Sequence, residues 1–78
     1  MKEQLIKLMA RLFECDVAEL TDDVGPGDIR GWDSLGHVAL MAAIQDEFGA
    51  HVPVEEAIEV ESIPDLVAIL AGLLGDGS

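Results

Sequence analysis

The side chains of this chain that are best suited to chemistry are one cysteine, two histidines and three serines. Cys15 has no second cysteine with which to form a disulfide. Its spacing to His37 and His51 suits neither a metal site nor a nucleophile–base pair. Ser34 differs because it follows Asp33 where a helical pattern begins, and either residue can cap that helix. The Ser34 hydroxyl is therefore expected at the exposed mouth of a helix, where another group can be attached.

Four aspartates between residues 22 and 33 suggest a second kind of site, a calcium-binding loop. Such a loop needs oxygen ligands at its third and fifth positions. Counted from Asp22, these positions hold Val24 and Pro26, which offer no side-chain oxygen. The sequence therefore predicts an acidic, solvated loop and no metal site.

The spacing of apolar residues predicts the elements that position Ser34. Residues 2–13, residues 34–48 and the segment that begins at Ser62 carry apolar side chains at three- and four-residue intervals, as amphipathic helices do. Residues 54–60 can form one or two further turns, whereas glycine and proline at 25–27 exclude a helix through the connection 14–32. We therefore expect an all-α fold over the single domain 1–78. It is a small four-helix bundle of three longer helices and one short helix, with a long loop between helix one and helix two.

Apolar residues in the connections are expected to hold them against the core. For the long loop these residues are Val17, Leu20, Val24, Ile29 and Trp32. Ile58 is expected to anchor the short helix. Ser62 is expected to cap the last helix, with Asp65 three residues later completing a capping box.

The apolar residues of the helix 34–48 fall on two nearly opposite sides of a helical wheel. The side expected to pack inward consists of Leu40, Met41, Ile44 and Phe48. The other side consists of Leu35, Val38 and Ala42. Because a domain this small seldom encloses a helix, this second side, beside Ser34, is predicted to dock partner proteins. The alternative is that neighbouring elements bury both sides.

Two residues in the first turn of this helix leave their roles open. Gly36 costs about 1 kcal/mol relative to alanine in helix propensity, which indicates close approach of a partner or of an attached group, or else simple tolerance. His37 is interpreted as a packed histidine rather than a general base, because no nearby residue completes a triad with it. Cys15 is likewise interpreted as a small, partly buried residue at a helix end.

The run Gly31-Trp32-Asp33-Ser34-Leu35, followed by a helix pattern that ends at Phe48-Gly49, resembles the acyl carrier proteins. The resemblance covers essentially the whole chain in length, acidity and helix order. It implies that Ser34 carries 4'-phosphopantetheine, which a phosphopantetheinyl transferase moves from coenzyme A. The thiol of that arm holds acyl groups as thioesters. The resemblance also implies that the chain is a substrate and a shuttle, not an enzyme, and has no catalytic residue.

The motif helix departs from one branch of that family. Carriers of fatty acid synthesis commonly place acids at its third and sixth positions, where this chain has Gly36 and Ala39. The departure favours a stand-alone carrier of a polyketide or other specialised pathway. An aminoacyl or peptidyl carrier and a fatty acid synthesis carrier stay open. A more distant alternative is a small acidic helical interaction domain without a prosthetic group, which would grip a partner helix with the same apolar strip.

The charge of the chain indicates its partners. A formal net charge of −12, from 16 acids against 4 bases, repels nucleic acid and favours acyl-loading and acyl-processing enzymes with basic surfaces, although solubility alone is an alternative explanation. The expected docking residues are Asp33, Leu35, Val38, Ala42, Glu55, Glu56 and Glu59. With no signal-peptide pattern and no apolar run long enough to span a membrane, a monomeric cytoplasmic protein is expected.

Overall fold

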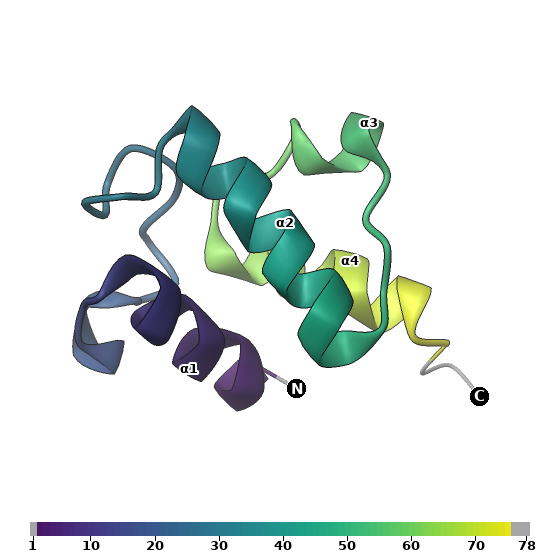
Figure 1. Ribbon diagram of the computed structural model, residues 1–78, viewed down its shortest axis with the longest axis horizontal. Coiled ribbons are helices and arrows are strands. Elements are labelled where there is room, and N and C mark those ends of the chain that lie inside the picture. Colours follow the sequence, from purple (N-terminus) through teal and green to yellow (C-terminus); the bar gives the residue numbers. More distant parts are fainter. Residues whose placement is uncertain (1, 76–78) are drawn as a thin grey trace.

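The computed structural model describes residues 2–75, and within that range the protein is built from helices without a strand. In chain order these are α1 (Lys2–Phe13), the 3₁₀ turn η1 (Val17–Glu19), α2 (Ser34–Phe48), α3 (Val54–Ala57) and α4 (Ile63–Leu73). The predicted all-α fold, with three longer helices, one short helix and a long loop before α2, is confirmed. In Figure 1, α2 runs across the middle of the molecule, with α1 on one side and α3 and α4 on the other.

The longer helices end where the sequence places residues that stop a helix. Gly49 follows α2 in the left-handed conformation, with φ at 69°, and its N–H donates to the Gln45 carbonyl at 2.9 Å. Glycine is favoured there because it has no Cβ to clash in that conformation. The bounds of α1 and α2 also agree with the predicted ranges 2–13 and 34–48, which confirms both predictions.

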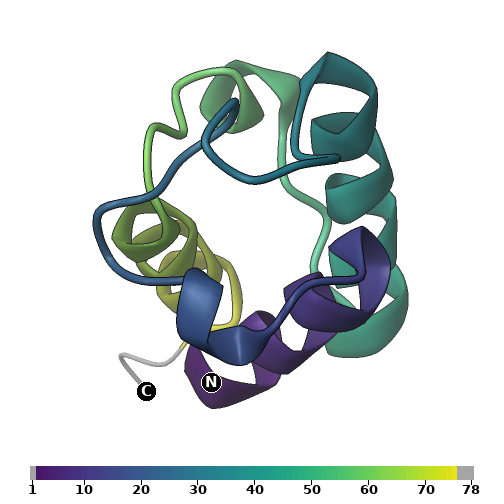
Figure 2. The same ribbon diagram turned by 90° about the vertical axis from the view of Figure 1, so that its left-hand side faces the viewer.

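The helices and the long loop share one apolar core. Figure 2 looks along the molecule and shows the elements arranged around a common centre. The fully buried side chains are Trp32, Leu5, Met9, Leu40, Ile44, Ile63, Leu66 and Leu70. Leu40 and Ile44 confirm the inward side of α2, with Met41 and Phe48 partly buried against the same cluster. Among residues 2–75 no polar or charged residue is buried.

The long loop is fixed to this core at several points. Leu20, Ile29 and Trp32 are buried and Val24 is partly buried, as predicted. Gly25 lies so close to the link between α3 and α4 that a Cβ added to it would overlap the Glu61 carbonyl group. The loop is therefore packed at both its middle and its end.

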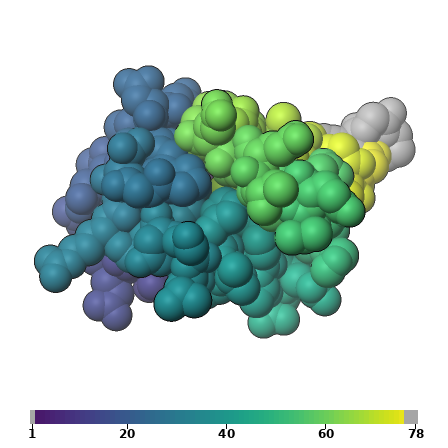
Figure 3. All heavy atoms as spheres, turned by 90° about the horizontal axis from the view of Figure 1, so that it is seen from above, coloured from purple at the N-terminus to yellow at the C-terminus, as the bar shows by residue number. Residues whose placement is uncertain are grey.

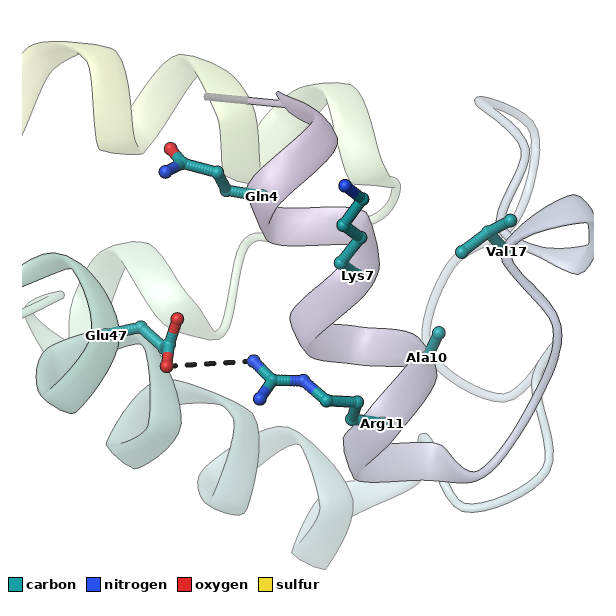
Figure 4. Close-up of a pocket in the computed structure, with 6 residues that line it drawn as sticks. All are labelled: Gln4, Lys7, Ala10, Arg11, Val17 and Glu47. Carbon is teal, nitrogen blue, oxygen red and sulfur yellow. Dashed lines mark ion pairs between the residues drawn. The ribbon is translucent and has the colours of Figure 1, made fainter.

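Val17 does not pack against the core as predicted, since its side chain is 53% exposed. The three-residue turn η1 buries none of its residues. Val17 instead lines an open groove of about 450 Å³ with the outer side of α1 and the end of α2. Figure 4 shows this groove, across which the Arg11 guanidinium lies 3.7 Å from the Glu47 carboxylate. Such an exposed ion pair contributes little to stability.

Two predictions for the second half of the chain are wrong. Ile58 is 76% exposed and anchors nothing, because α3 lasts only four residues and its neighbours Ala57 and Val60 are buried in place of Ile58. Ser62 precedes α4 but makes no side-chain capping bond. The Asp65 carboxylate reaches past Ser62 and accepts from the Glu61 N–H at 3.0 Å, so no capping box forms.

None of the helices in the described range is both long and apolar enough to cross a membrane.

Candidate functional site

Of the two residues that could cap α2, only one makes the capping hydrogen bond. Asp33 is the cap: its backbone is extended, and its carboxylate accepts from the Gly36 N–H at 2.8 Å. The Asp33 carbonyl also accepts from the His37 N–H at 2.7 Å. Ser34 is the first residue of the helix and is exposed, and its hydroxyl has no hydrogen-bond partner within residues 2–75. The hydroxyl is therefore free for covalent chemistry.

The interpretation of Gly36 needs correction, because neither a partner nor an attached group has to approach it. A Cβ added at Gly36 would overlap the Gly31 carbonyl oxygen and would lie 3.2 Å from Cε1 of Phe13. The chain's own loop therefore makes the close approach. Glycine at this position lets the loop pass over the first turn. The loop residues before Ser34 are thereby packed against the helix that begins with Ser34.

His37 is a packed, half-buried histidine with both ring nitrogens occupied. Its Nδ1 lies 2.9 Å from Trp32 Nε1, and its Nε2 lies 2.8 Å from the Ala57 carbonyl oxygen. The Trp32 and His37 rings are also stacked, with centroids 6.2 Å apart. A histidine bound in this way has no free nitrogen with which to act as a base toward Ser34.

The second side of α2 is exposed, which contradicts the alternative that neighbouring elements bury it. Leu35 is 82% exposed and Val38 is 68% exposed, and Ala42 is exposed as well. Sequence reasoning missed two further exposed apolar residues, Val54 and Ile58, which are 68% and 76% exposed, and Ile58 lines one groove with Val38. The acidic residues on both sides of Ile58 were the available signal, because residues between solvated acids in a short helix are seldom enclosed.

A groove of about 580 Å³ adjoins Ser34. The long loop, the start of α2, α3 and the link after α3 meet on the face of the molecule that Figure 3 presents. The groove is lined by Pro26, Gly27, Asp33, Ser34, His37, Val38, Ala57, Ile58 and Val60. Its walls are mostly apolar, and Asp33 is the acidic residue among them.

These residues fit the expected phosphopantetheine arm. An exposed hydroxyl is required for a phosphodiester, and the first N–H groups of a helix favour a phosphate beside it. The apolar groove next to Ser34 suits a slender chain with few charges. Asp33 opposes the phosphate by repulsion, which leaves most of the phosphate binding during attachment to the transferase.

The other candidate residues lie outside this groove. The acids predicted to meet basic partners, Glu55, Glu56 and Glu59, are all exposed on α3 and the residues after it. Cys15 is half-buried, as expected, and does not line the groove. Burial raises the pKa of the Cys15 thiol, and the negative charges of Glu19 and Asp16 raise it further. Residues 2–75 hold no cluster of three or more His, Cys, Asp or Glu side chains that could bind a metal ion.

Comparison with known proteins identifies the class of the chain. Residues 3–70 match the family described as "Phosphopantetheine attachment site". The chain is 32% identical over 75 residues to polyketide-8 synthase acyl carrier protein 2 of Streptomyces avermitilis, a match that covers 96% of this chain and 86% of that protein. It is 33% identical over 66 residues to an acyl carrier protein of Rickettsia bellii, with 85% of this chain and 82% of that protein covered.

The match over most of the chain excludes an interaction domain without a prosthetic group. A phosphopantetheine attachment site requires a 4'-phosphopantetheine group and the transferase that installs it. Proteins of this class are carriers and do not catalyse a reaction. On this evidence the chain belongs to the phosphopantetheine-bearing acyl carrier proteins.

Proposed function

We propose that Ser34 is the sole attachment site of phosphopantetheine. The observation that carries this proposal is the exposed, unpartnered hydroxyl of Ser34 between a capping aspartate and an apolar groove. In the transfer, the Ser34 oxygen forms a phosphodiester with the phosphate of phosphopantetheine. The diphosphate bond of coenzyme A breaks, the adenosine bisphosphate leaves, and the hydroxyl proton goes to a base of the transferase.

Mass spectrometry after incubation with coenzyme A and a broad-specificity transferase tests this proposal. The unmodified chain should gain one phosphopantetheinyl group, and Ser34→Ala should gain none. Because Asp33 supplies the cap, Ser34→Ala should keep its helical circular dichroism. Ser62→Ala is the matched control, since Ser62 makes no capping bond and should not affect modification. Modification of Ser34→Ala, or no modification of the natural chain, would overturn the assignment.

The docking surface for the transferase and for acyl-processing enzymes is proposed to surround Ser34. It combines the exposed apolar residues Leu35, Val38 and Ala42 with the acids Asp33, Glu55, Glu56 and Glu59. Apolar contact area supplies affinity, and the acids attract basic partner surfaces. The exposure of Leu35 and Val38 beside the proposed attachment site supports the proposal, because no other part of the described chain covers these apolar side chains.

A charge placed in this strip tests the docking surface. Val38→Asp should slow transfer of phosphopantetheine by raising the KM for the carrier, with little loss of helical content, because Val38 is 68% exposed. Val17→Asp is the matched control: Val17 is also an exposed valine, and it lines the groove between α1 and α2 instead. Equal slowing by both substitutions would indicate an effect of net charge and would refute a local docking surface.

The pathway is proposed to be polyketide or other specialised biosynthesis. Gly36 supports this proposal, because the loop above it leaves no room for the acidic side chain that fatty acid carriers commonly have at that position. The two relatives named above, a polyketide carrier and an acyl carrier protein, have similar sequence identity to this chain, so identity does not decide the pathway. An aminoacyl or peptidyl carrier and a fatty acid carrier are the competing candidates.

Loading of the modified chain distinguishes these candidates. It is offered malonyl-coenzyme A with a malonyl transferase of a polyketide pathway, or with one of fatty acid synthesis, and amino acids with an adenylating enzyme. The proposal expects the highest kcat/KM with the polyketide transferase. Faster loading by either of the other enzymes would reassign the pathway.

The chain is further proposed to act in the cytoplasm as one monomeric domain. All four helices contribute to a single apolar cluster, and a net charge of −12 opposes association with a second copy. Sedimentation at two ionic strengths tests this proposal. A dimer that persists at low salt would refute the monomer.

A further inference from the structure

Trp32 is held rigidly at the end of the loop that precedes Ser34. Its side chain is fully buried, and its ring is stacked on Phe13 with centroids 6.0 Å apart. Its backbone N–H donates to the Ile29 carbonyl at 2.9 Å, and its carbonyl accepts from the Gly27 N–H at 2.7 Å. The direction in which the indole N–H points is therefore fixed by the loop and the core.

The two partners of His37 determine where its proton lies. An indole N–H can only donate, so His37 Nδ1, 2.9 Å from it, must be an unprotonated acceptor. A carbonyl oxygen can only accept, so Nε2, 2.8 Å from the Ala57 oxygen, must carry the hydrogen. Both contacts are satisfied only by the neutral ring in its Nε2–H form. Protonation of Nδ1 would turn two N–H groups toward each other at 2.9 Å.

The element at the other end of this chain of hydrogen bonds is weakly packed. Within α3 only Ala57 is buried, and the flanking Val54 and Ile58 are more than two-thirds exposed. The Ala57 oxygen accepts from His37 and also, at 3.3 Å, from the Val60 N–H. Val52 and Val60, on either side of α3, are buried in the core, and the bond from His37 to Ala57 adds a hydrogen bond between α2 and α3.

We infer that His37 is a positioning residue that holds α3 against the start of α2 through the Trp32–His37–Ala57 hydrogen bonds. His37, Ala57 and Ile58 all line the groove beside Ser34. To keep this link, the side chain at position 37 must accept from the Trp32 indole N–H and donate to the Ala57 carbonyl. The groove wall formed by α3 is thus fixed by the donor and the acceptor of one side chain.

The state of His37 is defined by these hydrogen bonds and not by a charge partner. The charged residues on the surrounding elements are Glu14 after α1, Asp28, Arg30 and Asp33 at the end of the loop, and Glu55, Glu56, Glu59 and Glu61 in and after α3. All of these are exposed, and within the described part of the chain none forms an ion pair with His37. The inference goes beyond the proposed attachment at Ser34 and does not depend on it, because every contact it uses exists without the arm.

Nuclear magnetic resonance of the unmodified chain tests the inference, because the single tryptophan gives one indole N–H signal. At about pH 7.5, the ring nitrogen shifts of His37 should report a protonated Nε2 and an unprotonated Nδ1. In His37→Phe, which offers neither the acceptor nor the donor, the indole signal should move. In that variant the protection factor of the Ile58 amide, which donates to the Val54 carbonyl at 3.1 Å, should fall about three- to tenfold, the factor that one lost hydrogen bond represents.

Two variants separate this effect from a general loss of packing. His37→Gln keeps one acceptor and one donor, so its indole signal and Ile58 protection should stay close to those of the natural chain. His51→Phe, at the other histidine, should behave like the natural chain. The opposite tautomer in the natural chain, unchanged signals in His37→Phe, or equal changes in His37→Gln would each overturn the inference. If His37→Phe fails to fold, the tautomer in the natural chain and the signals of His37→Gln still decide the question.

Discussion

Replacement of Gly36 by alanine sets helix propensity against loop packing, and the two effects have opposite signs. Propensity alone predicts that Gly→Ala in a helix stabilises the fold by up to about 1 kcal/mol. At Gly36, however, the new Cβ would lie closer than 3.0 Å to the Gly31 carbonyl oxygen, which belongs to the backbone and cannot turn away. Gly31 itself has a φ of 92°, a conformation that further limits how the loop can adjust.

The size of the effect follows from these contacts. Overpacking a well-filled site costs about 1–3 kcal/mol, which exceeds the gain of about 1 kcal/mol from propensity. Gly36→Ala should therefore lower the free energy of unfolding by up to about 2 kcal/mol. Gly72→Ala is the matched control, because Gly72 is also helical and nothing lies within 4 Å of its added Cβ. That substitution should raise the free energy of unfolding by up to about 1 kcal/mol.

Urea unfolding followed by the fluorescence of Trp32 measures both variants, since Trp32 is fully buried and is the only tryptophan. With a urea m-value of about 1 kcal/mol/M for a small domain, these changes shift the midpoint by amounts of order 1 M in opposite directions. The double variant should be additive, because the two sites share no contacts. Stabilisation by Gly36→Ala similar to that by Gly72→Ala would show that the loop yields freely, and would refute the argument that glycine is needed there.

Three further predictions concern stability and reactivity. Glu14 has a left-handed backbone, with φ at 55°, just after α1, so Glu14→Gly should raise the free energy of unfolding in urea by about 0.5–1 kcal/mol relative to Glu14→Gln, which keeps the strain but removes the same charge. The raised pKa of Cys15 leaves less thiolate at a given pH, so alkylation by iodoacetamide at about pH 8 should be slower in the folded chain than in urea, and equal rates would contradict it. The net charge of −12 strains the compact state, so the melting temperature should rise as salt is raised from about 0.01 M to about 0.1 M, where a flat profile would contradict the charge argument.

The sequence was sufficient for the features that depend on neighbours in the chain. Apolar spacing gave the bounds of α1 and α2, and the left-handed Gly49 ended α2 as expected. The exposed strip around Val38 also followed from spacing, because a helix in a small domain can bury only one side. In each of these cases the deciding interaction lies within about one or two helical turns.

The wrong predictions for Val17 and Ile58, and the open question at Gly36, depended on how segments without a helical repeat fold back onto the helices. Nothing local to Gly36 reveals that the Gly31 carbonyl crosses above it, and nothing local to Val17 reveals that its turn faces an open groove. Ile58 was assigned to the core for its residue type, but the space it would occupy is filled by Ala57 and Val60. These outcomes depend on how the long loop and α3 fold back onto α2, which periodicity does not encode.

The environment of Ser34 explains why its hydroxyl alone is left free at the start of α2. Asp33 is committed to the Gly36 N–H, Gly36 is covered by the loop, and His37 is bound at both ring nitrogens. The loop over Gly36 and the two His37 contacts tie the helix start to other segments, and the Asp33 cap closes its first turn. Ser34 lies among them but takes part in none, so its hydroxyl is presented to solvent on a rigid base. A carrier needs this combination, because a partner enzyme has to find the attachment point in one defined orientation while the arm itself stays movable.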